Sequence, residues 1–100
     1  MSKFQYDEMN HILTLILDGE LTIENLKDVK SLFLEAFEKS DSISLDHTNA
    51  KEYDFSYLQL LCSAVKTAEA SGKKLFLRGN DSEAFKDLVK ESGFSNTKFF

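Results

Sequence analysis

The sequence of 100 residues contains little cysteine, little glycine and no long apolar run. Its single cysteine, Cys62, cannot form an intramolecular disulfide, a paired-cysteine redox motif or a multi-cysteine zinc site. The four glycines stand apart at 19, 72, 79 and 93, so no glycine-rich loop is available to surround a phosphate. His11 and His47 are the only histidines and do not complete a ligand set. We therefore expect neither a cofactor nor a metal site.

Basic residues are in the minority, with 12 Lys and Arg against 17 Asp and Glu and a formal net charge of −5. Lys27, Lys30, Lys73, Lys74 and Arg78 are scattered, whereas neutralising phosphates requires clustered cations. Nucleic acid and anionic membrane surfaces are therefore not expected as the main partner. No apolar stretch approaches the roughly 20 residues of a spanning helix, and the first four residues do not lead into a signal-type apolar core. We expect a cytoplasmic protein without membrane insertion.

Apolar residues make up 42% of the sequence, and nine of them are Phe. This content is sufficient to fill one modest hydrophobic core, and the length leaves no room for a second domain. Repeats, linkers and biased tracts are absent from the sequence. We therefore expect residues 1–100 to form a single globular domain.

The first half of the sequence predicts two strands, a helix and a third strand. Residues 4–8 and the aliphatic stretch 11–17 predict strands joined by a short turn. A helix capped by Thr22 and reaching about Lys39 is indicated by apolar residues at helical spacing. Residues 42–46 alternate between polar and apolar, which predicts a short strand, and the polar stretch 47–53 predicts a loop.

The second half predicts a helix, a strand and a last helix. The helix runs from Phe55 to about Ala70, where Ser71-Gly72 supplies a stop, and residues 73–78 form the strand. Asn80 and Glu83 approximate a capping box for a final helix that ends at Gly93. The tail from 94 to 100, with its terminal Phe99-Phe100, fits a short edge strand, a frayed end or a small apolar patch.

The predicted order is thus β-β-α-β-α-β-α with an optional last strand. Repeated β-α units favour a sheet with parallel strands, because the crossover helices cover it. We expect an α/β domain with a mixed sheet of four or five strands, a parallel core and three covering helices. In such sheets, sites collect at the loops that follow the carboxyl ends of strands.

Catalytic residues do not converge in the sequence. Ser56, His47 and either Asp46 or Asp54 supply the residue types of a hydrolase, but they lie in one short segment without a nucleophile elbow. Asp46 at a strand end resembles a response-regulator phosphoacceptor, yet the acidic residues that would hold magnesium are missing, since Asp18 falls in a turn. We therefore expect a protein that is not an enzyme.

The start of the second helix is the candidate site. Asp54 fits an N-cap whose carboxylate accepts from the backbone N–H of Ser56 or Tyr57, which places Ser56 in the first helical turn near solvent. A phosphate on Ser56 would be favoured by the helix dipole and opposed by nearby carboxylates. Aromatic side chains at this point are typical anchors of protein interfaces. The candidate partner-binding residues are Asp46, Asp54, Phe55, Ser56, Tyr57 and Gln59.

The segment from Ser44 to Leu61 resembles a STAS domain, in which a strand ending in Leu-Asp is followed by a short loop, an aspartate, a serine or threonine, and an amphipathic helix. Residues 15–22, which read Leu-Ile-Leu-Asp-Gly-Glu-Leu-Thr, are similar to that family's second strand and the turn after it. Residues 72–77 resemble its penultimate helix-to-strand passage. The resemblance covers about residues 4 to 94, and its specificity comes from the order and spacing of the motifs.

The resemblance implies a bacterial anti-sigma factor antagonist that docks onto an anti-sigma factor or switch kinase and thereby regulates transcription. Aligned on Asp54 and Leu58, the family's phosphoacceptor falls on Ser56. Phe55 replaces the first hydroxyl residue of the family pattern, and Tyr57 replaces its glycine. Tyr57 in place of the glycine and the continuation Leu58-Gln59-Leu60-Leu61 are at least as similar to divergent members that act without phosphorylation, as accessory subunits of lipid-transport ATPases or chemotaxis-type assemblies.

Overall fold

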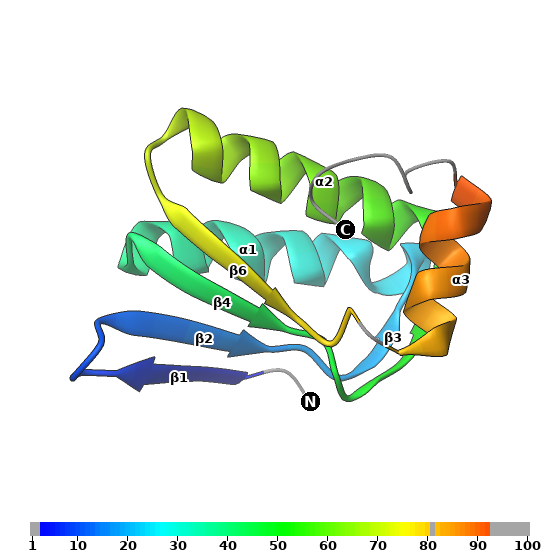
Figure 1. Ribbon diagram of the computed structural model, residues 1–100, viewed down its shortest axis with the longest axis horizontal. Coiled ribbons are helices and arrows are strands. Elements are labelled where there is room, and N and C mark those ends of the chain that lie inside the picture. Colours follow the sequence, from blue (N-terminus) through cyan, green and yellow to red (C-terminus); the bar gives the residue numbers. More distant parts are fainter. Residues whose placement is uncertain (1–2, 81, 93–100) are drawn as a thin grey trace.

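The computed structural model describes residues 3–80 and 82–92, in which strands and helices alternate (Figure 1). The elements are β1 (Lys3–Asp7), β2 (Ile12–Ile16), β3 (Gly19–Leu21), the 3-10 helix η1 (Ile23–Asn25), α1 (Leu26–Lys39), β4 (Ser42–Asp46), β5 (Ala50–Tyr53), α2 (Phe55–Ala70), β6 (Lys74–Arg78) and α3 (Glu83–Ser92). The predicted order of strands and helices is confirmed, and two short strands and a 3-10 helix are added to it.

The main sheet has the strand order β1-β2-β4-β6. β1 pairs antiparallel with β2, whereas β2, β4 and β6 run parallel to one another. The prediction of a mixed sheet with a parallel core is therefore confirmed, with four strands in the part of the chain that the structure describes. The suggested edge strand over 94–100 lies outside the described residues.

One face of the sheet forms the hydrophobic core with α1 and α2 (Figure 1). Alternate strand residues point toward these helices, because successive side chains of a strand leave opposite faces. Leu15 and Ile43 have no exposed surface, and burial of each such side chain stabilises the fold by about 1.5–3 kcal/mol. The opposite face carries the polar alternates Thr14 and Ser44 together with the exposed Phe76.

The polar stretch predicted as a loop contains β5, which pairs in parallel with β3 as a separate two-stranded sheet. The prediction of a continuous loop over 47–53 was wrong here. Because the two strands are short and lie about 30 residues apart, local alternation does not reveal their pairing. This small sheet leads directly into the start of α2.

Two predicted helix caps differ from the structure. Thr22 precedes η1, but its side chain makes no capping hydrogen bond, because the Asp54 carboxylate accepts from the first N–H of η1 instead. At α3, the cap is Ser82, whose Oγ accepts from the Phe85 N–H at 3.2 Å. The hydroxyl at 82 is one residue from the helix, so it displaces the predicted box of Asn80 and Glu83.

Candidate functional site

Asp54 organises the start of α2. Its Oδ1 accepts from the Tyr57 N–H at 3.0 Å, which confirms the predicted N-cap, and its Oδ2 accepts from the Ile23 N–H at 2.8 Å. One carboxylate therefore caps the amino ends of two helices, α2 and η1, that are distant in sequence. Each bond satisfies a backbone donor that has no partner within its own helix. The first turn of α2 is thus fixed relative to the segment that follows β3.

The side chains that follow Asp54 on the outer side of α2, and the first side chain of η1, are exposed or partly exposed. Ser56 is partly exposed in the first turn of α2, Phe55 is 48% exposed, and Gln59 is exposed one turn further on. Ile23, which starts η1, is 62% exposed. We call Ile23, Asp54, Phe55, Ser56 and Gln59 the α2-start surface. Sequence reasoning missed Ile23, because its spacing three residues before Leu26 fits the buried stripe of α1.

Tyr57 does not belong to that surface. Its side chain is fully buried, and its phenol hydroxyl lies 2.8 Å from Nδ1 of His47, which is also fully buried. The expectation that Tyr57 contributes to docking is therefore corrected. The physical reason is its position on the inner face of α2, in line with Leu58 and Leu61. Burial raises the pKa of Tyr57 well above its usual value, so the phenol stays protonated.

An aromatic cluster packs against the buried side of the first turn of α2. The His47 ring lies 4.6 Å from the Phe85 ring of α3, and the Tyr53 hydroxyl donates to the His47 carbonyl at 2.6 Å. Burial lowers the pKa of His47, and the Asn80 amide and the Asp46 carboxylate oppose this shift without cancelling it. No feature of the sequence indicated this cluster, because lone histidines and tyrosines in a polar stretch give no periodic signal.

The family model described as "Mlab, STAS domain" matches residues 4–98 of this chain. The chain belongs to the STAS domain family. This confirms the resemblance drawn from the sequence motifs, over almost the whole chain. A search of curated proteins finds no match.

Solved structures of STAS domains share the fold. An anti-sigma factor antagonist STAS domain from Rhodobacter sphaeroides aligns with a TM-score of 0.67 and 22% identity, covering 84% of this chain and 92% of that one. Unphosphorylated SpoIIAA, an anti-sigma factor antagonist, aligns with a TM-score of 0.68 and 15% identity over 90% of this chain and 82% of that one. Phosphorylated SpoIIAA, a Bacillus cell fate determinant, aligns with a TM-score of 0.67 and 17% identity, covering 93% of this chain and 84% of that one.

Asp46 of this STAS domain shapes the loop after β4. Its Oδ1 accepts from the backbone N–H of Thr48 at 3.0 Å and from the Thr48 hydroxyl at 2.6 Å. Burial acts to raise the pKa of Asp46, but these two hydrogen bonds and the positive charge of Arg78 lower it below its usual value. The carboxylate is partly exposed. A direct contact of Asp46 with a partner stays a prediction.

The structure separates the residues of a hydrolase set. Nδ1 of His47 bonds to the Tyr57 hydroxyl, and Asp46 bonds to Thr48, so neither of these interactions is directed at Ser56. Burial also keeps the imidazole away from solvent. In the described part of the chain, no helix combines the length and apolar character required to cross a bilayer.

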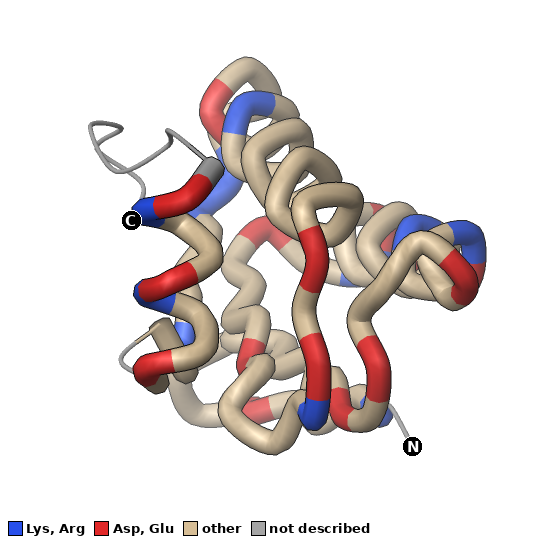
Figure 2. Tube along the Cα trace, turned by 90° about the vertical axis from the view of Figure 1, so that its right-hand side faces the viewer, with Lys and Arg blue, Asp and Glu red and all other residues tan. Residues whose placement is uncertain are grey.

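The surroundings of the α2-start surface are acidic. Residues 18–25 and 50–57 contain Asp18, Glu20, Glu24, Glu52 and Asp54, whereas their only basic residue is Lys51. Five acidic residues against one basic residue give these segments a formal charge of −4. Figure 2 shows the molecule from the right-hand side of Figure 1, with acidic residues in red on several of the segments that face the viewer. A binding partner with a basic surface would be attracted here.

Proposed function

We propose that this STAS domain is a non-catalytic regulatory module that binds an anti-sigma factor, or an analogous ATP-binding switch kinase, through the α2-start surface. The observation that carries the proposal is the double cap by Asp54, which presents Ser56 and Phe55 partly exposed on a rigid helix start. A rigid, partly apolar surface binds with little loss of conformational entropy. The shared fold of two anti-sigma factor antagonists supports the same proposal.

The proposal includes phosphorylation of Ser56 as the control of binding. The hydroxyl sits at the amino end of α2, where the helix dipole favours a negative group by typically about 0.3–1 kcal/mol. A phosphate would add almost two negative charges beside Asp54 and Glu52 and would change the shape of the surface. The unmodified domain then binds its partner, and the modified domain does not. SpoIIAA, which shares the fold, has been solved in both forms.

Mass spectrometry tests the modification. The domain is incubated with an anti-sigma factor kinase from the same host and ATP, and its intact mass is measured. We expect the wild type and the control Ser63→Ala, an exposed serine of the same helix, to gain one phosphate, whereas Ser56→Ala gains none. No gain on the wild type, or an unchanged gain in Ser56→Ala, would remove the switch from this position.

A second candidate function is supported by the burial of Tyr57. Where the family pattern has a glycine after the phosphoacceptor, this chain has a tyrosine bonded into the core through His47. This arrangement favours a constitutive accessory subunit of a lipid-transport ATPase or chemotaxis-type assembly. Purification from the native host distinguishes the two: a stable complex that forms equally with wild type and Ser56→Ala, without phosphate, supports the accessory role.

A further inference from the structure

β6 is the outer strand of the sheet in the part of the chain that the structure describes. The Lys74 N–H donates to the Asp41 carbonyl at 2.8 Å, and the Arg78 carbonyl accepts from the His47 N–H at 3.0 Å, so both residues bond toward β4. The N–H and C=O of one strand residue point to the same side, and the side alternates along the strand. Leu75 and Leu77 therefore present their N–H and C=O groups to the outside of the sheet.

A groove runs along this outer edge. It has a volume of about 540 Å³, and α2 forms one wall while β6 forms the other. Its apolar lining comes from Val65 and Ala68 on α2 and from Leu75 and Leu77 on β6. Figure 1 shows the two elements diverging from the turn that connects them. In β-strand addition, an extended peptide pairs with an exposed sheet edge and places alternate side chains in pockets.

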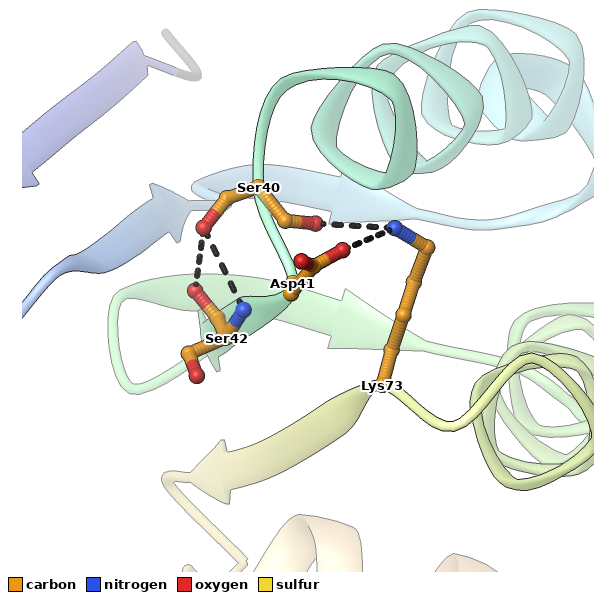
Figure 3. A network of polar contacts seen from close by, with 4 residues as sticks. All are labelled: Ser40, Asp41, Ser42 and Lys73. Carbon is orange, nitrogen blue, oxygen red and sulfur yellow. Dashed lines mark hydrogen bonds and ion pairs between the residues drawn. The ribbon is translucent and has the colours of Figure 1, made fainter.

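The charged side chains of β6 lie on the face of the strand that points away from the groove. Lys74 and Arg78 are exposed at the two ends of the strand, and Phe76, which is 48% exposed, lies between them on the same face. Lys73, at the end of the groove, is already engaged: its Nζ donates to Asp41 at 2.9 Å and to the Ser40 carbonyl at 3.2 Å (Figure 3). A strand added here would thus meet positive charge at both ends of β6.

We propose that β6 binds an extended acidic segment of a partner protein as an additional antiparallel strand. Cross-strand neighbours share a face, so the segment places aliphatic residues opposite Leu75 and Leu77, in the groove. Acidic residues lie opposite Lys74 and Arg78, and an aromatic residue lies opposite Phe76. The segment has the pattern acidic, aliphatic, aromatic, aliphatic, acidic. This surface is separate from the α2-start surface, and the inference does not rest on the proposed function.

The charges of Lys74 and Arg78 favour an acidic segment over two other sequences that could pair with β6, a second copy of β6 and residues 93–100 of the chain. A second copy paired antiparallel about Phe76 would place Lys74 opposite Arg78 at both ends, and like charges directly opposite each other destabilise a strand pair. Residues 93–100 of the chain contain Lys98 and no acidic residue. Neither sequence supplies the carboxylates that the ends of β6 favour.

A synthetic peptide tests the site on the full chain. The probe is the capped peptide Gly-Glu-Val-Tyr-Val-Glu-Gly, titrated into ¹⁵N-labelled protein, with affinity measured by fluorescence anisotropy. We expect shifts at the amides of Leu75 and Leu77. N-methylation of both valines removes the main-chain donors but keeps the side chains, and a second control replaces both glutamates with lysine. We expect each control peptide to bind at least tenfold more weakly.

A pair of protein variants locates the peptide. Val65→Arg places a bulky charge in the groove and abolishes binding, whereas Ser63→Arg, on an exposed position of the same helix, leaves it unchanged. Four results overturn the inference: no binding at millimolar peptide, shifts centred elsewhere, equal affinity for the N-methylated peptide, or slow hydrogen exchange of the Leu75 and Leu77 amides in the free protein. Slow exchange at every protein concentration would mean that another segment of the same chain covers the edge of β6. Slow exchange only at high protein concentration would mean that a second copy of the chain covers it.

Discussion

The Asp54 carboxylate accepts from a backbone N–H in the first turn of α2 and from the first N–H of η1. Asp54→Ala removes the acceptor of both helix starts, and we expect it to lower the free energy of unfolding by about 1–2 kcal/mol, the usual cost of a lost cap. Asp54→Asn keeps one acceptor oxygen and should fall between this variant and the wild type. Urea unfolding followed by circular dichroism measures the series.

Asp41→Ala is the matched control for this series. Its carboxylate is 92% exposed and pairs with Lys73 on the surface, so its removal should cost less than about 1 kcal/mol. Equal stability of wild type, Asp54→Asn and Asp54→Ala would show that the double cap does not stabilise the helix starts.

His47 makes stability depend on pH. Burial lowers its pKa below the usual 6.5, so the unfolded chain binds a proton before the folded chain does. We therefore expect the contribution of His47 to the free energy of unfolding to be complete above about pH 6.5. That contribution should fall as the pH drops from there toward the folded-state pKa, by up to about 1.4 kcal/mol per pH unit.

Urea unfolding between pH 7.5 and 5.5 tests this dependence. His47→Gln should flatten the pH profile over this range, even if the variant is less stable throughout. His11→Gln, which changes an exposed histidine, should keep the slope of the wild type. A slope that survives in His47→Gln would mean that another group titrates.

At the scale of elements, the loop after β6 lies close to the loop after β4, which carries His47 of the aromatic cluster. Gly79 has φ +99°, and a Cβ atom there would lie 2.6 Å from the Thr48 N and 2.8 Å from Cδ2 of His47. Gly79→Ala should therefore lower stability by roughly 2–5 kcal/mol, from backbone strain together with overpacking. Gly72→Ala is the control, because its φ is +71° but its Cβ meets nothing within 4 Å, so strain alone costs about 1–2 kcal/mol. Thermal unfolding that ranks the two variants equally would contradict the close contact.

The elements also show how far the sequence determines the structure. Strong periodicity predicted the helices and the main strands, because core residues repeat at the spacing of each element. The pairing of β3 with β5 was not predicted, since it joins two short segments through non-local bonds. The 3-10 helix η1 was missed for a similar reason: its first N–H donates to the side chain of Asp54, which is distant in sequence.

The site was predicted in part for the same physical reasons. The Asp54 cap is a local interaction between residues three apart, and the sequence indicates it directly. The burial of Tyr57 depends on His47, which lies in a polar stretch that gives no signal of burial. Sequence reasoning therefore located the helix start correctly but assigned one of its aromatic residues to the wrong side.

At the scale of the whole molecule, charge is distributed unevenly. Residues 18–25 and 50–57, around the α2-start surface, are acidic, whereas the exposed edge at β6 has basic ends. Two surfaces of opposite charge would allow this small domain to contact two partners, or two parts of one partner. Binding at the acidic surface should weaken with added salt, because exposed charges are screened beyond roughly 8 Å at physiological ionic strength.

Isothermal titration calorimetry with an anti-sigma factor kinase of the same host measures whether the α2-start surface binds the partner. We predict that Phe55→Ala weakens binding at least tenfold. Leu34→Ala, which removes an exposed apolar side chain of α1 with a similar exposure of 53%, should bind within about twofold of the wild type. Binding of Phe55→Ala with wild-type affinity, to a partner that binds the wild type, would show that the α2-start surface is not the binding surface.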